Sequence, residues 1–230
     1  MKTSFKGDEQ FKLKDYSQNT PEKGSFFDNW FSNKKGKILE AGCGVGNYVI
    51  VFSKAGFGVT GIELDKKRAE LAKKNAQKYS VSAKIICRDI RKLPFKADSF
   101  DFIFSHWVVE HFPETQKGVN ELYKVLKRNG YTMISVPARL SSFLLFKYVQ
   151  VFIDKIFKIG LWNCGYEKSF TLWRFRKLLK KAGFKLIEEK ISQAVPGKRF
   201  PIMGTIERVL DKPFYWLGIG GRFMHFWCEK

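Results

Sequence analysis

The chain has 230 residues, of which 44% are hydrophobic and 28% are charged, and its formal net charge is +20. This length accommodates one large α/β domain with an added subdomain, and the apolar content excludes an intrinsically disordered chain. The charge reflects either a general excess of lysine or an affinity for phosphate, on nucleic acid or on an anionic membrane. We expect no membrane span or secretory signal, and four scattered cysteines indicate a reduced, cytoplasmic protein without a zinc or disulfide framework.

Strand-like and helix-like segments alternate through the first part of the chain. A polar stretch predicts a loose arm over 1–20, and apolar residues at helical spacing predict a helix over 21–33. The expected strands are 37–41, 58–63, 83–87, 100–105 and 131–136. Helices are expected at 47–55, 65–79 and 113–128, the second capped by Asp65 with Leu71 and Ala72 facing inward, the third ended by Asn129 and Gly130. Such alternation predicts a parallel, doubly wound sheet.

The regular alternation of expected strands and helices ends after Pro137. An apolar helix with one narrow polar stripe is expected over 141–162. The later expected elements are a helix over 171–183, a strand over 184–191, a helical stretch over 203–213 and a strand over 223–228.

A glycine cluster follows the first expected strand. Gly42, Gly44 and Gly46 give the spacing G-x-G-x-G, and Asn47 stands where a dinucleotide fingerprint has its third glycine. No phosphate loop is present either. The preceding acid, Glu40, would repel a pyrophosphate but suits an ammonium group. The cluster therefore favours a nucleoside joined to an amino acid over a dinucleotide, and a dehydrogenase is disfavoured.

These residues carry a family resemblance. Residues 40–46 (EAGCGVG) resemble the first motif of class I S-adenosylmethionine-dependent methyltransferases. Residues 91–101 (RKLPFKADSFD) and 122–130 (LYKVLKRNG) resemble the type-11 methyltransferase-domain group, which includes ubiquinone and menaquinone biosynthesis enzymes. The resemblance covers about 35–137, with a weaker match over 170–184.

The resemblance implies a Rossmann-like, doubly wound, seven-stranded and mostly parallel sheet of order 3-2-1-4-5-7-6, with a helical cap inserted after strand five. We accordingly divide the chain into four parts. They are a loose arm (1–20), the S-adenosylmethionine-binding core (21–137), the helical cap (138–170) and a completion of the sheet with a further helical insertion (171–230).

It also implies S-adenosyl-L-methionine as cofactor and S-adenosyl-L-homocysteine as product. Glu63 would bind the ribose hydroxyls and Asp89 the adenine amine, although each acid has a purely structural alternative. Glu40 would lie near the ammonium group. The expected cofactor-binding residues are Glu40, Gly42, Cys43, Gly44, Gly46, Asn47, Glu63, Leu64, Asp89, Ile90, Ser105 and His106. These residues lie at the carboxyl ends of neighbouring strands, where open α/β sheets bind ligands.

Two of the three histidines, His106 and His111, flank a short segment after the fourth strand. Either could be a general base, and the resemblance favours His111; the alternative is a structural histidine bonded to the backbone. Glu110 and His111 also resemble part of a metal site in polyprenyl-catechol O-methyltransferases. Trp107 stands where those enzymes have a second glutamate, so we expect no metal.

The acceptor depends on residues 139–230, which carry 18 basic and 7 acidic side chains. Their apolar and basic character favours a small-molecule or lipid-like acceptor, presented by peripheral association with an anionic membrane. A self-packed cap over any small molecule is the alternative. An RNA methyltransferase is less favoured because no recognition module is visible, and a non-catalytic S-adenosylmethionine-binding protein is the other class. No pattern indicates an oligomeric state.

Overall fold

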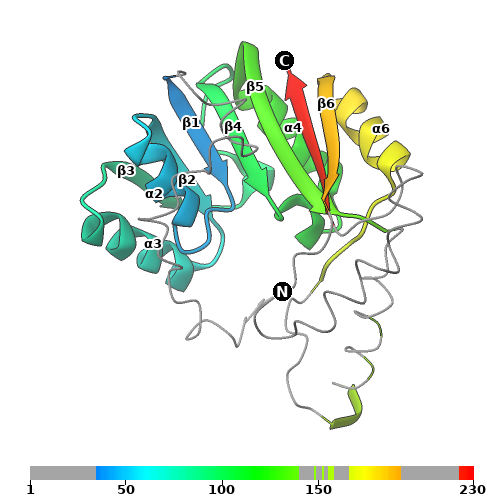
Figure 1. Cartoon of the computed structure of the whole chain (residues 1–230), viewed down its shortest axis with the longest axis horizontal. Helices are drawn as coiled ribbons and strands as arrows, with labels where there is room; N and C mark the ends of the chain where they lie inside the picture. The colour runs from blue at the N-terminus through cyan, green and yellow to red at the C-terminus, as the bar shows by residue number, and fades with distance from the viewer. Residues whose placement is uncertain (1–34, 140–147, 149–151, 153–154, 158–165, 193–222) are drawn as a thin grey trace. The chain divides into compact units, whose positions relative to one another are not determined.

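The computed structural model describes residues 35–139, 148, 152, 155–157, 166–192 and 223–230 (Figure 1). The expected arm (1–20), the helix at 21–33, most of 141–162 and the stretch at 203–213 lie outside the described residues.

Seven strands form a sheet with the order β3-β2-β1-β4-β5-β7-β6, which confirms the expected fold. β1 pairs in parallel with β2 and β4, β2 pairs in parallel with β3, and β6 pairs antiparallel with β7. The bounds are β1 Lys37–Ala41, β2 Gly58–Glu63, β3 Ala83–Cys87, β4 Phe100–His106, β5 Leu126–Pro137, β6 Lys185–Ser192 and β7 Phe223–Glu229.

The register of the parallel strands places their carboxyl ends side by side. Glu40 on β1 lies opposite Gly61 on β2 and Phe104 on β4. Glu63 at the end of β2 lies opposite Cys87 at the end of β3. β1 is buried from Ile38 onward because it is central to the sheet.

Four α-helices and two short 3₁₀ helices connect the described strands. Their bounds are α2 Asn47–Lys54, α3 Lys66–Lys78, η2 Ile90–Lys92, η3 Val109–His111, α4 Thr115–Val125 and α6 Leu172–Ala182. As expected, the Asp65 side chain caps α3 by accepting a bond from the Arg68 N–H at 2.9 Å. Ala72 is buried as predicted, but Leu71 is only half-buried, because it lies beside the buried stripe of α3, which consists of Ala69, Ala72, Asn75 and Ala76.

The expected helix at 113–128 is too long. α4 ends at Val125, and β5 starts at Leu126. The last carbonyls of α4 accept bonds from outside the helix: the Ser99 N–H bonds to the Val125 oxygen at 2.9 Å. Asn129 has the predicted left-handed conformation (φ 59°), but within β5 rather than at a helix end.

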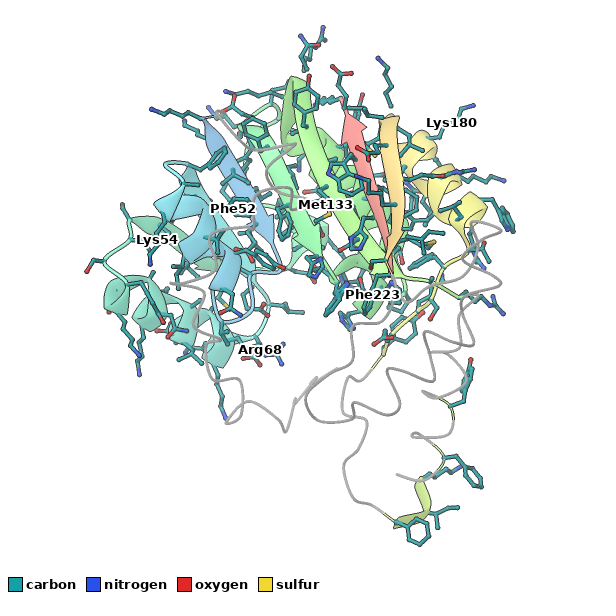
Figure 2. The ribbon with its side chains drawn as sticks, in the orientation of Figure 1. Phe52, Lys54, Arg68, Met133, Lys180 and Phe223 are labelled. Atoms are coloured by element: carbon teal, nitrogen blue, oxygen red, sulfur yellow. The ribbon has the colours of Figure 1, made fainter. Side chains whose placement is uncertain are left out.

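The chain divides into two compact units. One contains β1, β2, β3 and β4 up to Ser105, together with α2 and α3; the other contains α6, β6 and β7. Phe52 on α2 packs edge-on against Phe104, with ring centroids 5.2 Å apart, in the first unit (Figure 2). Phe175 on α6 packs against Phe226 on β7, at 4.8 Å, in the second. Each unit therefore has its own aromatic core.

Figure 1 shows α2 and α3 beside the strands of the first unit and α6 beside β6. Within the described residues, no helix combines the length and apolar character needed to cross a membrane.

Candidate functional site

The turn between β1 and α2 needs glycine for its backbone conformation. Gly42, Gly44 and Gly46 have φ of 80°, 54° and 89°, a left-handed region that side chains disfavour. The N–H groups of Gly42 and Cys43 both donate to the Ile62 oxygen at 2.8 Å, which ties the turn to the end of β2.

Two glycines also permit close packing around this turn. A Cβ on Gly46 would lie 3.2 Å from the Ala72 Cβ, so Gly46 lets α3 approach. A Cβ on Gly61 would lie 2.9 Å from the buried Cys43 Sγ. The sequence analysis missed Gly61, although a glycine inside a strand often marks a close approach. A Cβ on Gly44, by contrast, would have no described atom within 4 Å, so this part of the turn borders open space.

The carboxylate of Glu63 is held by backbone donors. Its Oε2 accepts the Gly44 N–H at 2.8 Å and its Oε1 accepts the Asp65 N–H at 2.9 Å. A carboxylate oxygen can accept more than one bond, so Glu63 is oriented and can still accept hydroxyl donors. This geometry suits the ribose contact expected at this position.

Glu40 is an acidic side chain that is buried in the first unit. Its side chain is 4% exposed, and its Oε2 has no hydrogen-bond partner among the described residues. Burial, and secondarily the charge of Glu63, raise the Glu40 pKa well above its ordinary value. A buried carboxyl oxygen without a partner favours a neutral form or a bound cation. Burial and the nearby Glu40 also raise the pKa of the Cys43 thiol, so Cys43 stays neutral.

Four further buried polar atoms in the same unit lack partners within the described part of the chain. Besides Ser53 Oγ and Thr132 Oγ1, two of them belong to predicted cofactor-binding residues. They are Oδ1 of Asn47, the first residue of α2, and Oγ of Ser105, which is fully buried on β4. Most buried polar groups in proteins are hydrogen-bonded, so these atoms of Glu40, Asn47 and Ser105 have capacity to bond to a polar ligand. These residues thus fit the amino-acid part of S-adenosylmethionine.

Asp89 has a partner that the sequence analysis did not anticipate. It caps η2 by accepting the Arg91 N–H at 2.8 Å, and its Oδ2 also accepts a bond from Arg91 Nη2 at 2.6 Å. Of its neighbours, Ile90 is buried, whereas the apolar side chain of Leu64 is 57% exposed and available to a flat ring.

His106 is neutral and belongs to a polar pair. Its Nδ1 lies 2.5 Å from the Ser135 Oγ, and its ring lies 6.2 Å from that of His225 at an interplanar angle of 9°. Burial, and secondarily His225, lower the His106 pKa to about 3. His106 therefore carries no positive charge at neutral pH.

In His111, one ring nitrogen contacts a backbone carbonyl group. Its Nδ1 lies 3.1 Å from the Tyr166 carbonyl oxygen, which can only accept a bond. We assign the proton to Nδ1 on that basis, which leaves Nε2 with a lone pair. Nε2 is thus the nitrogen of His111 that can accept a proton.

Trp107 was not assigned a cofactor or catalytic role from the sequence, but its backbone is unusual. It has φ 57°, a conformation that is uncommon for a bulky residue. Its N–H donates to the Ser135 oxygen at 3.2 Å, and its ring stacks on Phe223, with centroids 4.2 Å apart. Phe223 begins β7 (Figure 2). The exposed part of Trp107 (42%) adds an aromatic surface next to His106.

Metal ligation has no support in the part of the chain that the structure describes. No group of three or more His, Cys, Asp or Glu side chains there could hold an ion.

The sheet order, with a glycine turn after β1 and an acid at the end of β2, is the Rossmann-like arrangement expected of the methyltransferase fold. Residues 39–134 match the family model described as a methyltransferase domain. This match confirms, for residues 39–134, the resemblance to S-adenosylmethionine-dependent methyltransferases that the motifs predicted.

Curated relatives and solved structures also resemble this chain. The chain is 29% identical over 126 residues to a ubiquinone biosynthesis O-methyltransferase of Coxiella burnetii, covering 54% of this chain and 53% of the relative. It is 27% identical over 198 residues to an S-adenosyl-L-methionine-dependent Diels-Alderase of Talaromyces variabilis, covering 83% of this chain and 66% of the relative. A crystal structure of a methyltransferase from Methanosarcina mazei shares the fold, with a TM-score of 0.63, 17% identity, and coverage of 85% of this chain and 92% of that one. The chain spans about half the length of the Coxiella relatives.

Proposed function

We propose that the protein transfers a methyl group from S-adenosylmethionine to a small, apolar acceptor by in-line displacement. The observation that carries this proposal is the buried Glu40 carboxyl, whose Oε2 has no partner among the described residues. An ammonium group would supply the missing donor and counter-charge, and the methionine part of the cofactor bears one.

Each element of the first unit would hold one part of the cofactor. The glycine turn would pass along the methionine part at the open position of Gly44, and Ser105 would line it. Glu63 would accept the ribose hydroxyls, a charge-assisted contact. The Asp89 carboxylate can accept further hydrogen bonds besides those from Arg91, and we expect it to accept one from the adenine amine. Leu64 and the Ile90 backbone would lie beside the adenine ring. When bound, the cofactor supplies an electrophilic methyl group.

His111 is our proposed general base. Its Nδ1 donates to the Tyr166 carbonyl, which fixes the ring and leaves Nε2 as the proton acceptor. His106 would line the methionine side as a neutral ring, because its low pKa prevents charging beside a sulfonium. The chemistry needs mainly positioning and exclusion of water, with the base used for a hydroxyl or phenol acceptor.

An apolar acceptor is supported by the surface after β5. The helical residues at 148, 152 and 155–157 include four large hydrophobic side chains that are more than half exposed: Tyr148, Phe152, Ile156 and Phe157. We propose that Tyr148, Phe152, Ile156 and Phe157 face the acceptor or lipid, and that the protein works in the cytoplasm at a membrane surface. The Coxiella relative, named for ubiquinone biosynthesis, supports the same acceptor class.

A second candidate is a protein that binds S-adenosylmethionine without transferring its methyl group. The relative that covers 83% of the chain is named a Diels-Alderase, which supports keeping this alternative. Consumption of the cofactor separates the two candidates: a methyltransferase forms S-adenosylhomocysteine stoichiometrically with methylated product.

The test combines binding and turnover. S-adenosylmethionine should raise the melting temperature of the purified chain, and a radiolabelled methyl group should appear in polyprenyl phenols or lipids rather than in RNA. His111→Gln should lower turnover about 100-fold while leaving cofactor affinity unchanged. Cofactor binding without any methylated product would favour the second candidate, and labelled RNA would contradict the apolar acceptor.

A further inference from the structure

α6 has a cationic exposed face. Five of its 11 residues are Arg or Lys, and none is acidic. Phe175 and Leu179 are buried, and Phe175 packs against Phe170 at 5.1 Å as well as against Phe226. The buried side therefore holds the helix in place, and the charges face solvent.

Only one of these five basic side chains forms an ion pair within the described structure. Arg176 pairs with Glu189 on β6. The other four cations have no ion-pair or hydrogen-bond partner among the described residues; they are Arg174, Lys177, Lys180 and Lys181. Like charges three or four residues apart destabilise a helix. Packing and local pairing thus give no reason for this arrangement.

The same helix exposes a large aromatic ring. Trp173, in its first turn, is 67% exposed. The next strand, β6, contacts α6 and exposes the apolar side chains of Leu186 (36%) and Ile187 (43%). Tryptophan flanked by lysine and arginine is typical of side chains at a lipid–water interface.

We propose that Trp173, Arg174, Lys177, Lys180 and Lys181, here called the α6 cationic face, dock on an anionic lipid surface. The cations would pair with headgroup phosphates while the indole enters the interfacial layer.

A lipid surface fits these residues better than RNA does. α6 exposes a single aromatic ring rather than a row of stacking platforms for bases. Leu186 and Ile187, which are exposed on β6, are aliphatic and therefore cannot stack on a base. The α6 cationic face shares no residue with the proposed cofactor site or with His111, but it rests on the membrane-surface part of the proposed function.

Vesicle co-sedimentation of the full chain tests the proposal. Phosphatidylcholine vesicles with phosphatidylglycerol should bind the protein, and vesicles of phosphatidylcholine alone should not. The variant K177E/K180E/K181E should lower the partition coefficient more than about tenfold, since each basic residue near the surface contributes. W173A should lower it about threefold or more, and the blue shift of tryptophan emission on vesicle binding should decrease in W173F.

The matched control changes net charge equally on another helix. Lys66, Lys67 and Lys74 on α3 are exposed, and K66E/K67E/K74E should lower the partition coefficient less than about threefold. Equal loss in both triple variants would show that only total charge matters and would overturn the proposal. Absence of vesicle binding, or α6-dependent binding to an RNA oligonucleotide instead, would also overturn it. Cofactor binding by every variant, measured in parallel, reports folding and tests the proposed function separately.

Discussion

Glu40 and Glu63 are carboxylates on neighbouring strands with opposite surroundings. Glu63 is held by two backbone N–H groups, whereas the Oε2 atom of Glu40 is buried without a partner in the described structure. The difference follows from position: Glu63 ends β2 and meets the turn, but Glu40 lies within β1 between two paired strands. We therefore expect the two residues to affect ligand binding and stability in different ways.

Glu63→Ala should weaken S-adenosylmethionine binding by about 1.5–3 kcal/mol, because it removes a charged hydrogen-bond acceptor and releases the Gly44 N–H. Isothermal titration calorimetry measures this directly. Glu70→Ala, on the exposed side of α3, is the control and should bind normally. Unchanged affinity in Glu63→Ala would mean that the ribose lies elsewhere.

Glu40→Gln should change how stability depends on pH. The folded-state pKa of Glu40 is raised, so the folded chain holds a proton that the unfolded chain has lost above its ordinary pKa near 4.5. Glu40 therefore lowers the free energy of unfolding as pH rises above that value. Urea unfolding at pH 5 and pH 7 should show a smaller decline in Glu40→Gln than in the native chain. An identical decline would indicate that Glu40 is ionised in the folded state.

His225 should act in the opposite direction. Burial lowers its pKa to about 4, below the ordinary value of 6.5, so the folded chain resists protonation that the unfolded chain accepts. Stability is then lost as pH falls from 6.5 toward 4. His225→Gln should reduce the loss between pH 6.5 and pH 5 by about 1–2 kcal/mol, measured by urea unfolding. A steeper loss in the variant would contradict the assignment.

In β2, the Cys43 side chain occupies the space that a side chain on Gly61 would need. Gly61→Ala would place a Cβ against the Cys43 Sγ, so we expect a loss of about 1–3 kcal/mol in the free energy of unfolding. Gly58→Ala on the same strand is a close control, since the nearest atom to its Cβ would be 3.8 Å away. Equal unfolding midpoints for the two variants in urea would show that the glycine turn moves to accommodate the added methyl group at little cost in stability.

The connection from β4 into η3 combines backbone strain with aromatic stacking. Trp107 keeps its left-handed conformation because Ser135 binds its N–H and Phe223 stacks on its ring. Strained residues that neighbours hold in place often lie at functional sites. The proposed base, His111, belongs to the 3₁₀ helix that follows, so this connection determines the base's position.

The division into two units makes a prediction for the whole molecule. The proposed contacts to the cofactor, apart from His106, come from the unit that contains β1–β3, whereas α6, β6 and β7 belong to the other. Saturating S-adenosylmethionine should therefore slow amide hydrogen exchange in β1, β2 and α2 more than in α6 and β6. Uniform slowing throughout would indicate that the two units open together.

Much of the fold could be predicted from residue order. The bounds of β1, β2 and β3 agree with the sequence prediction, because buried runs bounded by glycine and polar residues leave few alternatives. The junction of α4 and β5 was predicted wrongly, since partners distant in sequence, Ser99 and Lys230, bind its backbone. Glu63 and Glu40 could be identified as candidate ligands, but their partners could not.

The sequence by itself determined the class of the protein, because a glycine turn with flanking acids and a fixed alternation of strands and helices are local patterns. Tertiary structure alone decided which groups are paired: Arg176 with Glu189, His106 with Ser135, and Glu40 Oε2 with no described residue. Pairing, burial and pKa depend on distances between residues far apart in the chain, which one-dimensional spacing does not encode.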